Sequence, residues 1–171
     1  LPGDGTVLDA GVHTLTVTFT PEDATNYESA TASAVLNVMQ AEAAIAWPLP
    51  APILYGTALG DAQLNATADT PGNLFYKQPA GMVLPAGTHL LTVTFTPDDT
   101  RNYGPASATV MLTVTKATPS LAWPQPAPIA YGTALGAGQL SASASVPGTF
   151  VYSPAAGTVL SAGTHALTVV G

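Results

Sequence analysis

Residues 87–97 read Gly-Thr-His-Leu-Leu-Thr-Val-Thr-Phe-Thr-Pro and carry the pattern that decides the fold. Leu91, Val93 and Phe95 alternate with threonines, so the apolar side chains share one face of the segment. This period of two predicts a β-strand with one buried face. A second alternating segment follows at residues 108–115, and we expect the two segments to form an antiparallel pair joined by the loop between them.

The same strand sequence occurs three times at a constant spacing. It begins at Gly11, Gly87 and Gly163, and both intervals (87 − 11 and 163 − 87) equal 76 residues. A second marker, Ala-Trp-Pro followed by Tyr-Gly-Thr-Ala-Leu-Gly, begins at Ala46 and again at Ala122, which is also an interval of 76. Two independent markers with one spacing indicate a tandem repeat.

The repeat divides the chain into three segments. With the tryptophan segment as the start of a unit, residues 42–116 form one complete copy. Residues 1–41 match the C-terminal part of a preceding copy, and residues 117–171 match the N-terminal part of a following copy. Both ends fall inside a unit, so we expect the chain to be a segment of a longer array.

Turn-forming residues divide the complete copy into roughly six or seven short strands. Pro71-Gly72 separates alternating segments at 64–69 and 74–76, and the prolines between 48 and 52 favour an edge strand. Helical periodicity extends no further than a single turn at 57–62. The pattern predicts an all-β fold made of immunoglobulin-like Greek-key sandwich modules without a disulfide.

The composition excludes several classes of function. The chain has 47% hydrophobic but only 8% charged residues, and its formal net charge of −7 opposes binding to nucleic acid and to anionic membrane surfaces. The absence of cysteine excludes disulfides and thiolate metal sites. Thr, Gly and Pro interrupt every apolar stretch, so the sequence predicts no membrane insertion.

The segment at 94–103, Thr-Phe-Thr-Pro-Asp-Asp-Thr-Arg-Asn-Tyr, resembles the bacterial immunoglobulin-like repeats of large surface proteins and adhesins. The resemblance extends over the whole chain. It implies tandem extracellular or cell-surface modules that act as a stalk or spacer and sometimes carry a binding tip. The partners that it implies are the neighbouring repeats of the same protein.

The acidic loops are the best candidates for a metal site. Each loop offers two adjacent carboxylates, Glu22 and Asp23 in one copy and Asp98 and Asp99 in the next, and calcium binds carboxylate and carbonyl oxygens. Aspartate also caps turns by accepting hydrogen bonds from nearby backbone N–H groups. We favour turn capping and predict no cofactor, with calcium as the alternative.

Aromatic and proline residues allow two interpretations each. Trp47, Trp123, Tyr55 and Tyr131 are candidates for a sugar-stacking strip, but large aromatic side chains more often pack into a core. The proline runs at 48–52 and 124–128 are candidates for polyproline ligands, but edge strands protected from aggregation are the favoured interpretation.

The recurring histidines and tyrosines also favour structural roles. His13, His89 and His165 are one position repeated in different modules, so they are not expected to share a metal ion. For Asn26-Tyr27 and Asn102-Tyr103 we expect a tyrosine that hydrogen-bonds backbone beneath its loop, with ligand binding as the alternative.

The sequence therefore predicts a structural spacer of a cell-surface or secreted bacterial protein, with an adhesion or carbohydrate-binding module as the alternative. An enzyme is not predicted, because the sequence has no nucleophile elbow, phosphate-binding loop or paired catalytic carboxylates. Residues 117–171 lack two strands that residues 11–38 possess, so self-association by strand complementation is a further prediction.

Overall fold

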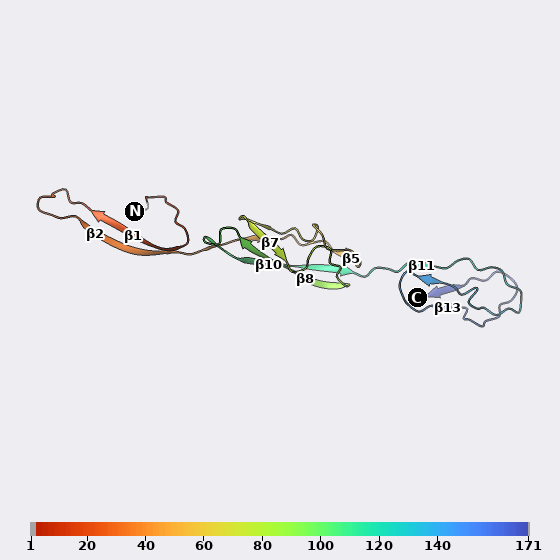
Figure 1. Ribbon diagram of the computed structural model, residues 1–171. Helices are drawn as coiled ribbons and strands as arrows, with labels where there is room; N and C mark the ends of the chain where they lie inside the picture. The colour runs from red at the N-terminus through yellow and green to blue at the C-terminus, as the bar shows by residue number, and fades with distance from the viewer. Residues whose placement is uncertain (1–2, 171) are drawn as a thin grey trace. The chain divides into compact units, whose positions relative to one another are not determined.

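The protein is described by a computed structural model of residues 3–170, which form strands, turns and irregular segments with no helix among them (Figure 1). The prediction of an all-β fold is confirmed. The chain divides into two compact units, Leu1–Lys116 and Ala117–Gly171. Within residues 3–170, no helix is long and apolar enough to span a bilayer.

The main sheet of the first unit has four strands. Their order across the sheet is β5 (Ile53–Leu54), β10 (Ala106–Thr115), β8 (Gly87–Pro97) and β7 (Gly72–Tyr76). The β8 and β10 strands pair antiparallel, as the alternating segments predict, with Phe95 opposite Ala106. On its other edge β10 pairs with β5 in parallel, with Val114 opposite Ile53.

Two small sheets accompany the four-stranded sheet within the complete repeat. Strands β4 (Ile45–Ala46) and β6 (Thr67–Ala68) pair antiparallel, whereas β3 (Ala41–Glu42) and β9 (Tyr103–Gly104) pair in parallel. Strand β6 is shorter than the alternating segment predicted at 64–69. Val83 forms a single antiparallel bridge with Ala58.

The core lies beneath the β8 and β10 strands. Its buried members are Leu59, Leu84, Leu91, Leu112 and Val114, and the partly buried side chains packed on them are Trp47, Ile53, Leu64 and Val110. Phe95 is also buried, with 1% of its surface exposed. Gly72 on β7 lies against the Phe95 ring and the Thr96 carbonyl, where a Cβ atom would overlap both.

The N-terminal hairpin repeats the β8–β10 pair. Strands β1 (Gly11–Phe19) and β2 (Ala30–Val38) have the same register, with Phe19 opposite Ala30. Equivalent residues of the two pairs differ in burial. Phe19 is 65% exposed, whereas the equivalent Phe95 is 1% exposed. Within the described residues, β1 and β2 form a sheet of two strands, so nothing corresponds to the β5 and β7 neighbours that cover β8 and β10.

The second unit contains the counterparts of β4, β6, β7 and the middle of β8. They are β11 (Leu121–Ala122), β12 (Ser143–Ala144), β13 (Val151–Ser153) and β14 (Thr168–Val170). β11 pairs with β12 and β13 with β14, all antiparallel. The bridge between Ala134 and Val159 repeats the one between Ala58 and Val83 at an interval of 76 residues.

Candidate inter-repeat joint

The acidic loop between β8 and β10 is closed by Asp99. One carboxylate oxygen accepts hydrogen bonds from the backbone N–H groups of Arg101 and Asn102, both at 3.1 Å. The other accepts a bond from the Asn102 side-chain amide at 2.8 Å. The Tyr103 N–H donates to the Asp99 carbonyl at 3.1 Å, which completes the turn. This is the geometry of an aspartate that caps a turn.

The equivalent loop of the hairpin has the same internal geometry. Asp23 accepts backbone hydrogen bonds from Thr25 and Asn26, both at 3.2 Å, and the Asn26 amide donates to its second oxygen at 2.8 Å. The two loops therefore agree closely although their surroundings differ. It follows that each loop is closed by its own residues and presents its outer face in a fixed conformation.

The hydrogen bonds also lower the pKa of the Asp99 and Asp23 carboxylates. The side-chain bond from Asn102, followed by the backbone N–H bonds, holds the pKa of Asp99 below its ordinary value. The Asn26 side chain lowers the pKa of Asp23 in the same way. Both groups are thus ionised acceptors at neutral pH.

Asn102 joins this loop to residues that precede the complete repeat. Its side-chain oxygen accepts a hydrogen bond from the Ala10 N–H at 2.7 Å, and its amide donates to Asp9 at 3.1 Å. Its backbone carbonyl accepts a bond from the Ala41 N–H at 2.8 Å. One residue therefore contacts both ends of the hairpin that precedes the repeat.

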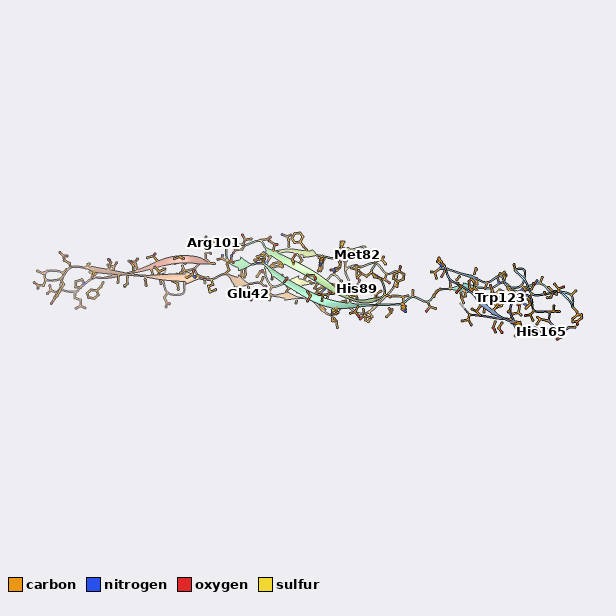
Figure 2. All side chains as sticks on the ribbon, turned by 90° about the horizontal axis from the view of Figure 1, so that it is seen from below. Glu42, Met82, His89, Arg101, Trp123 and His165 are labelled. Carbon is orange, nitrogen blue, oxygen red and sulfur yellow. The ribbon has the colours of Figure 1, made fainter. Side chains whose placement is uncertain are left out.

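Two neighbouring side chains add to the joint. The Gln40 amide donates to the carbonyl oxygens of Thr100 at 2.8 Å and Arg101 at 3.3 Å. Arg101 forms an ion pair with Asp9 at 2.9 Å, and the two side chains are 65% and 51% exposed. Because exposed ion pairs contribute little, we assign most of the joint's stability to its hydrogen bonds with the backbone. Figure 2 shows Arg101 and Glu42 at the same end of the complete repeat.

The candidate calcium ligands have other contacts. Both oxygens of Asp99 and of Asp23 accept hydrogen bonds from N–H groups, which a cation would have to displace. Asp98 accepts a bond from Asn73 at 3.4 Å. Within residues 3–170 no group of three or more His, Cys, Asp or Glu side chains is arranged to hold a metal ion. Calcium binding at Glu22, Asp23, Asp98 or Asp99 stays the untested alternative to turn capping.

Both tryptophans are partly buried and form contacts within their own units. The Trp47 indole N–H donates to the Gln63 carbonyl at 3.0 Å, and its ring contacts Tyr76 edge-on with centroids 5.4 Å apart. Trp123 repeats both contacts with Gln139 and Tyr152. Both indole N–H groups are thus bonded within their own units. The exposed tyrosines of the proposed strip are Tyr55 and Tyr131, at 53% and 79%.

The prediction for the loop tyrosines was wrong. Within residues 3–170 the structure has no hydrogen bond for the hydroxyls of Tyr27 or Tyr103, and Tyr27 is 66% exposed. The tyrosines that bond backbone are Tyr76, whose hydroxyl accepts from the Ala66 N–H at 2.9 Å, and its counterpart Tyr152. Their recurrence after 76 residues was the only sequence evidence for this role.

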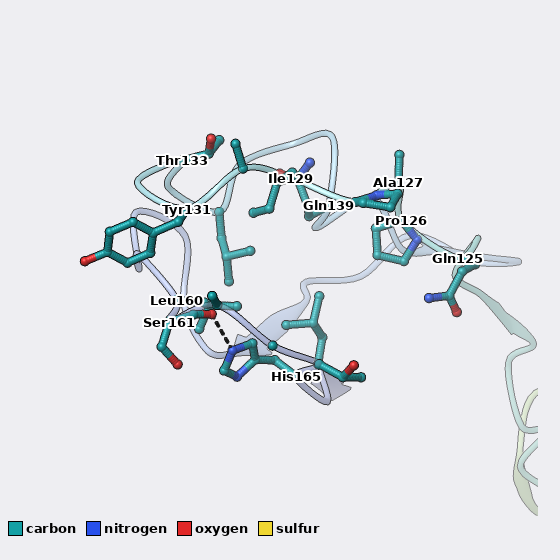
Figure 3. Close-up of a pocket in the computed structure, with 17 residues that line it drawn as sticks. Gln125, Pro126, Ala127, Ile129, Tyr131, Thr133, Gln139, Leu160, Ser161 and His165 are labelled. Atoms are coloured by element: carbon teal, nitrogen blue, oxygen red, sulfur yellow. Dashed lines mark hydrogen bonds between the residues drawn. The ribbon is translucent and has the colours of Figure 1, made fainter.

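The histidines have one shared contact. Each ring donates from Nε2 to the backbone carbonyl oxygen four residues earlier, and the pairs are His13 with Asp9, His89 with Pro85 and His165 with Ser161. The bond lengths are 2.7, 2.7 and 2.8 Å. His13 and His89 therefore bond across the turn at which β1 and β8 begin, and His165 makes its bond to Ser161 as Figure 3 shows.

Comparisons of the chain with protein-family models, curated protein sequences and solved structures found no match. The geometry of the joint is therefore the basis on which a function is proposed.

Proposed function

We propose that the chain is a structural spacer built from tandem immunoglobulin-like modules. In this interpretation the sheet β5-β10-β8-β7 is one layer of a small Greek-key sandwich, and the short sheets, with Trp47 over the core, are the other. The observation that carries the proposal is the joint, where a loop closed by its own hydrogen bonds also bonds the backbone of Ala10 and Ala41. The partners of each module are its neighbouring repeats.

The chemistry of the joint suits a spacer. A spacer must transmit orientation from one module to the next, and this requires contacts that resist rotation about the linker. Asn102 accepts hydrogen bonds from the N–H groups of both Ala10 and Ala41 and so holds the two ends of the preceding hairpin at once, whereas a single linker would allow rotation. By its resemblance to surface repeats, we propose an extracellular or cell-surface location and no catalytic activity.

Hydrogen exchange at Ala10 tests the joint. Replacement of Asn102 by alanine removes the acceptor of the Ala10 N–H, and one hydrogen bond contributes about 0.5–1.5 kcal/mol, so we expect the Ala10 amide to exchange roughly 2–10 times faster. The matched control is Asn26→Ala, which removes the same bond within the first loop but no joint contact that the structure describes. Unchanged exchange at Ala10 in Asn102→Ala would contradict the proposal.

A further inference from the structure

Strand β7 forms one edge of the four-stranded sheet. It pairs antiparallel with β8, and within residues 3–170 no strand pairs with its other side. This edge lies inside the complete repeat at 42–116 and is open with the strands of that repeat around it. An open edge is a place where another extended strand can add.

The free backbone groups of this edge are known from its bonds to β8. The Lys77 N–H donates to the Thr92 carbonyl at 2.9 Å, so Lys77 faces β8. Bonding alternates along an antiparallel pair, and the backbone groups of Gly72, Leu74 and Tyr76 therefore point away from β8. Within the described residues the structure gives these groups no hydrogen-bond partner.

The side chains around the edge are mostly apolar. Residues 71–76 read Pro-Gly-Asn-Leu-Phe-Tyr and carry no charge, although the formal net charge of the chain is −7. Phe75 is 60% exposed. A hollow of about 350 Å³ borders the strand, with Leu64 and Leu74 in its lining and Asp61 as its one charged lining residue. The edge thus offers free backbone groups and apolar surface together, as strand addition requires.

We propose that β7 is a self-association site and that its occupant is the β7 strand of a second copy of this chain, paired antiparallel about a twofold axis at Leu74. A strand edge presents both donors and acceptors, so two identical edges complement each other in this orientation. Lys77 is placed opposite Pro71 of the second copy, so no like charges face each other. This inference goes beyond the spacer function and does not depend on it.

The free backbone groups set the register of the contact. With Leu74 on the axis, Gly72 lies opposite Tyr76 of the second copy, and each opposed pair exchanges two backbone hydrogen bonds. A shift by one residue would instead oppose these groups to residues that already bond β8. A shift by two would leave some of them unpaired.

The same register buries apolar side chains on both faces of the sheet. Phe75 lies opposite Asn73 of the second copy, and the two Phe75 rings are diagonal neighbours, within reach of each other. On the other face, Leu74 of the second copy lies beside Leu74, where the hollow opens. Burial of these side chains is the driving force for association.

Amide exchange measured residue by residue in the full chain tests the contact. The Leu74 and Tyr76 amides should exchange about 10-fold more slowly at a concentration where the dimer predominates than in the monomer. The Asn73 and Phe75 amides face β8 and are the internal control, so they should be protected at both concentrations. Sedimentation should show a closed dimer, because the contact uses the same surface of both copies.

Lysine variants test which surface is used. Phe75→Lys places a charge at the edge and, because the dimer carries the change twice, should weaken association by about 10-fold or more. Leu90→Lys changes a 53% exposed side chain on the same face of the sheet but away from the edge, and should leave association unchanged. Val151→Lys changes the counterpart of Phe75 in the second unit, where the side chain is 69% exposed, and should also have no effect.

Three results would each overturn the proposal. The first is a parent chain that stays monomeric up to about 1 mM. The second is a control lysine that weakens association as much as Phe75→Lys, which would place the contact on the sheet face or in the second unit. The third is association without slower exchange at Leu74 and Tyr76. Protection of the Asn73 amide in every variant verifies that β7 is still paired with β8.

Discussion

Replacement of Phe95 by alanine should lower the free energy of unfolding of the complete repeat by about 3–5 kcal/mol. The ring is 1% exposed and packs against β7, where Gly72 leaves the space that it occupies. Its removal deletes buried apolar surface and leaves a cavity, and both effects destabilise the fold. The measurement is urea unfolding followed by a probe within residues 42–116.

The repeat provides a matched control for this variant. Phe19 occupies the same position of the same strand sequence but is 65% exposed. Phe19→Ala should change the free energy of unfolding by about 0.5 kcal/mol or less at a concentration where the chain is monomeric. Equal losses for the two variants would show that the hairpin face is covered within the monomer, which contradicts the described structure.

Replacement of Gly72 by alanine should destabilise the complete repeat by about 1–3 kcal/mol. An added Cβ would overlap the backbone oxygen of Thr96, which cannot move without breaking the sheet, and also the Phe95 ring. The backbone angle of Gly72 is not the reason, because its φ lies outside the left-handed region. The measurement is again unfolding of residues 42–116 in urea.

Gly148 is the counterpart of Gly72 and serves as its control. No heavy atom lies within 4 Å of a Cβ built at Gly148, so Gly148→Ala should change stability by about 0.5 kcal/mol or less. The two glycines should differ because the Phe95 ring and the Thr96 carbonyl of β8 lie against Gly72, whereas Gly148 has no such neighbour. If the Gly72→Ala variant is as stable as the parent chain, β7 and β8 are not packed as described.

The elements that could be predicted from the sequence are those with a local pattern. Strict alternation along 87–97 and 108–115 predicted the β8–β10 pair, and the recurring glycines predicted its repetition as β1–β2. The alternation did not predict which of these strand faces is buried. The same alternation gives a core face at Val93 and an exposed face at Val17, because burial depends on which other strands lie alongside.

The parallel pairs and the joint had no local pattern. Strands β5 and β3 contribute two residues each, too few for any periodicity, and their partners β10 and β9 are distant in sequence. The contact between Ala10 and Asn102 joins residues 92 positions apart. The candidate carboxylate Asp99 was found because it stands in a loop, whereas the role of Asn102 required knowledge of what that loop faces.

A distance distribution between two spin labels tests the central claim, that a preformed loop fixes one repeat on the next. Because the chain has no cysteine, a variant with Thr18→Cys on β1 and Thr109→Cys on β10 carries one label at each of these two exposed positions. The proposed joint predicts one narrow distribution, which broadens in Asn102→Ala and stays narrow in Asn26→Ala. A broad distribution in the chain with an intact joint would contradict the claim that the joint is rigid.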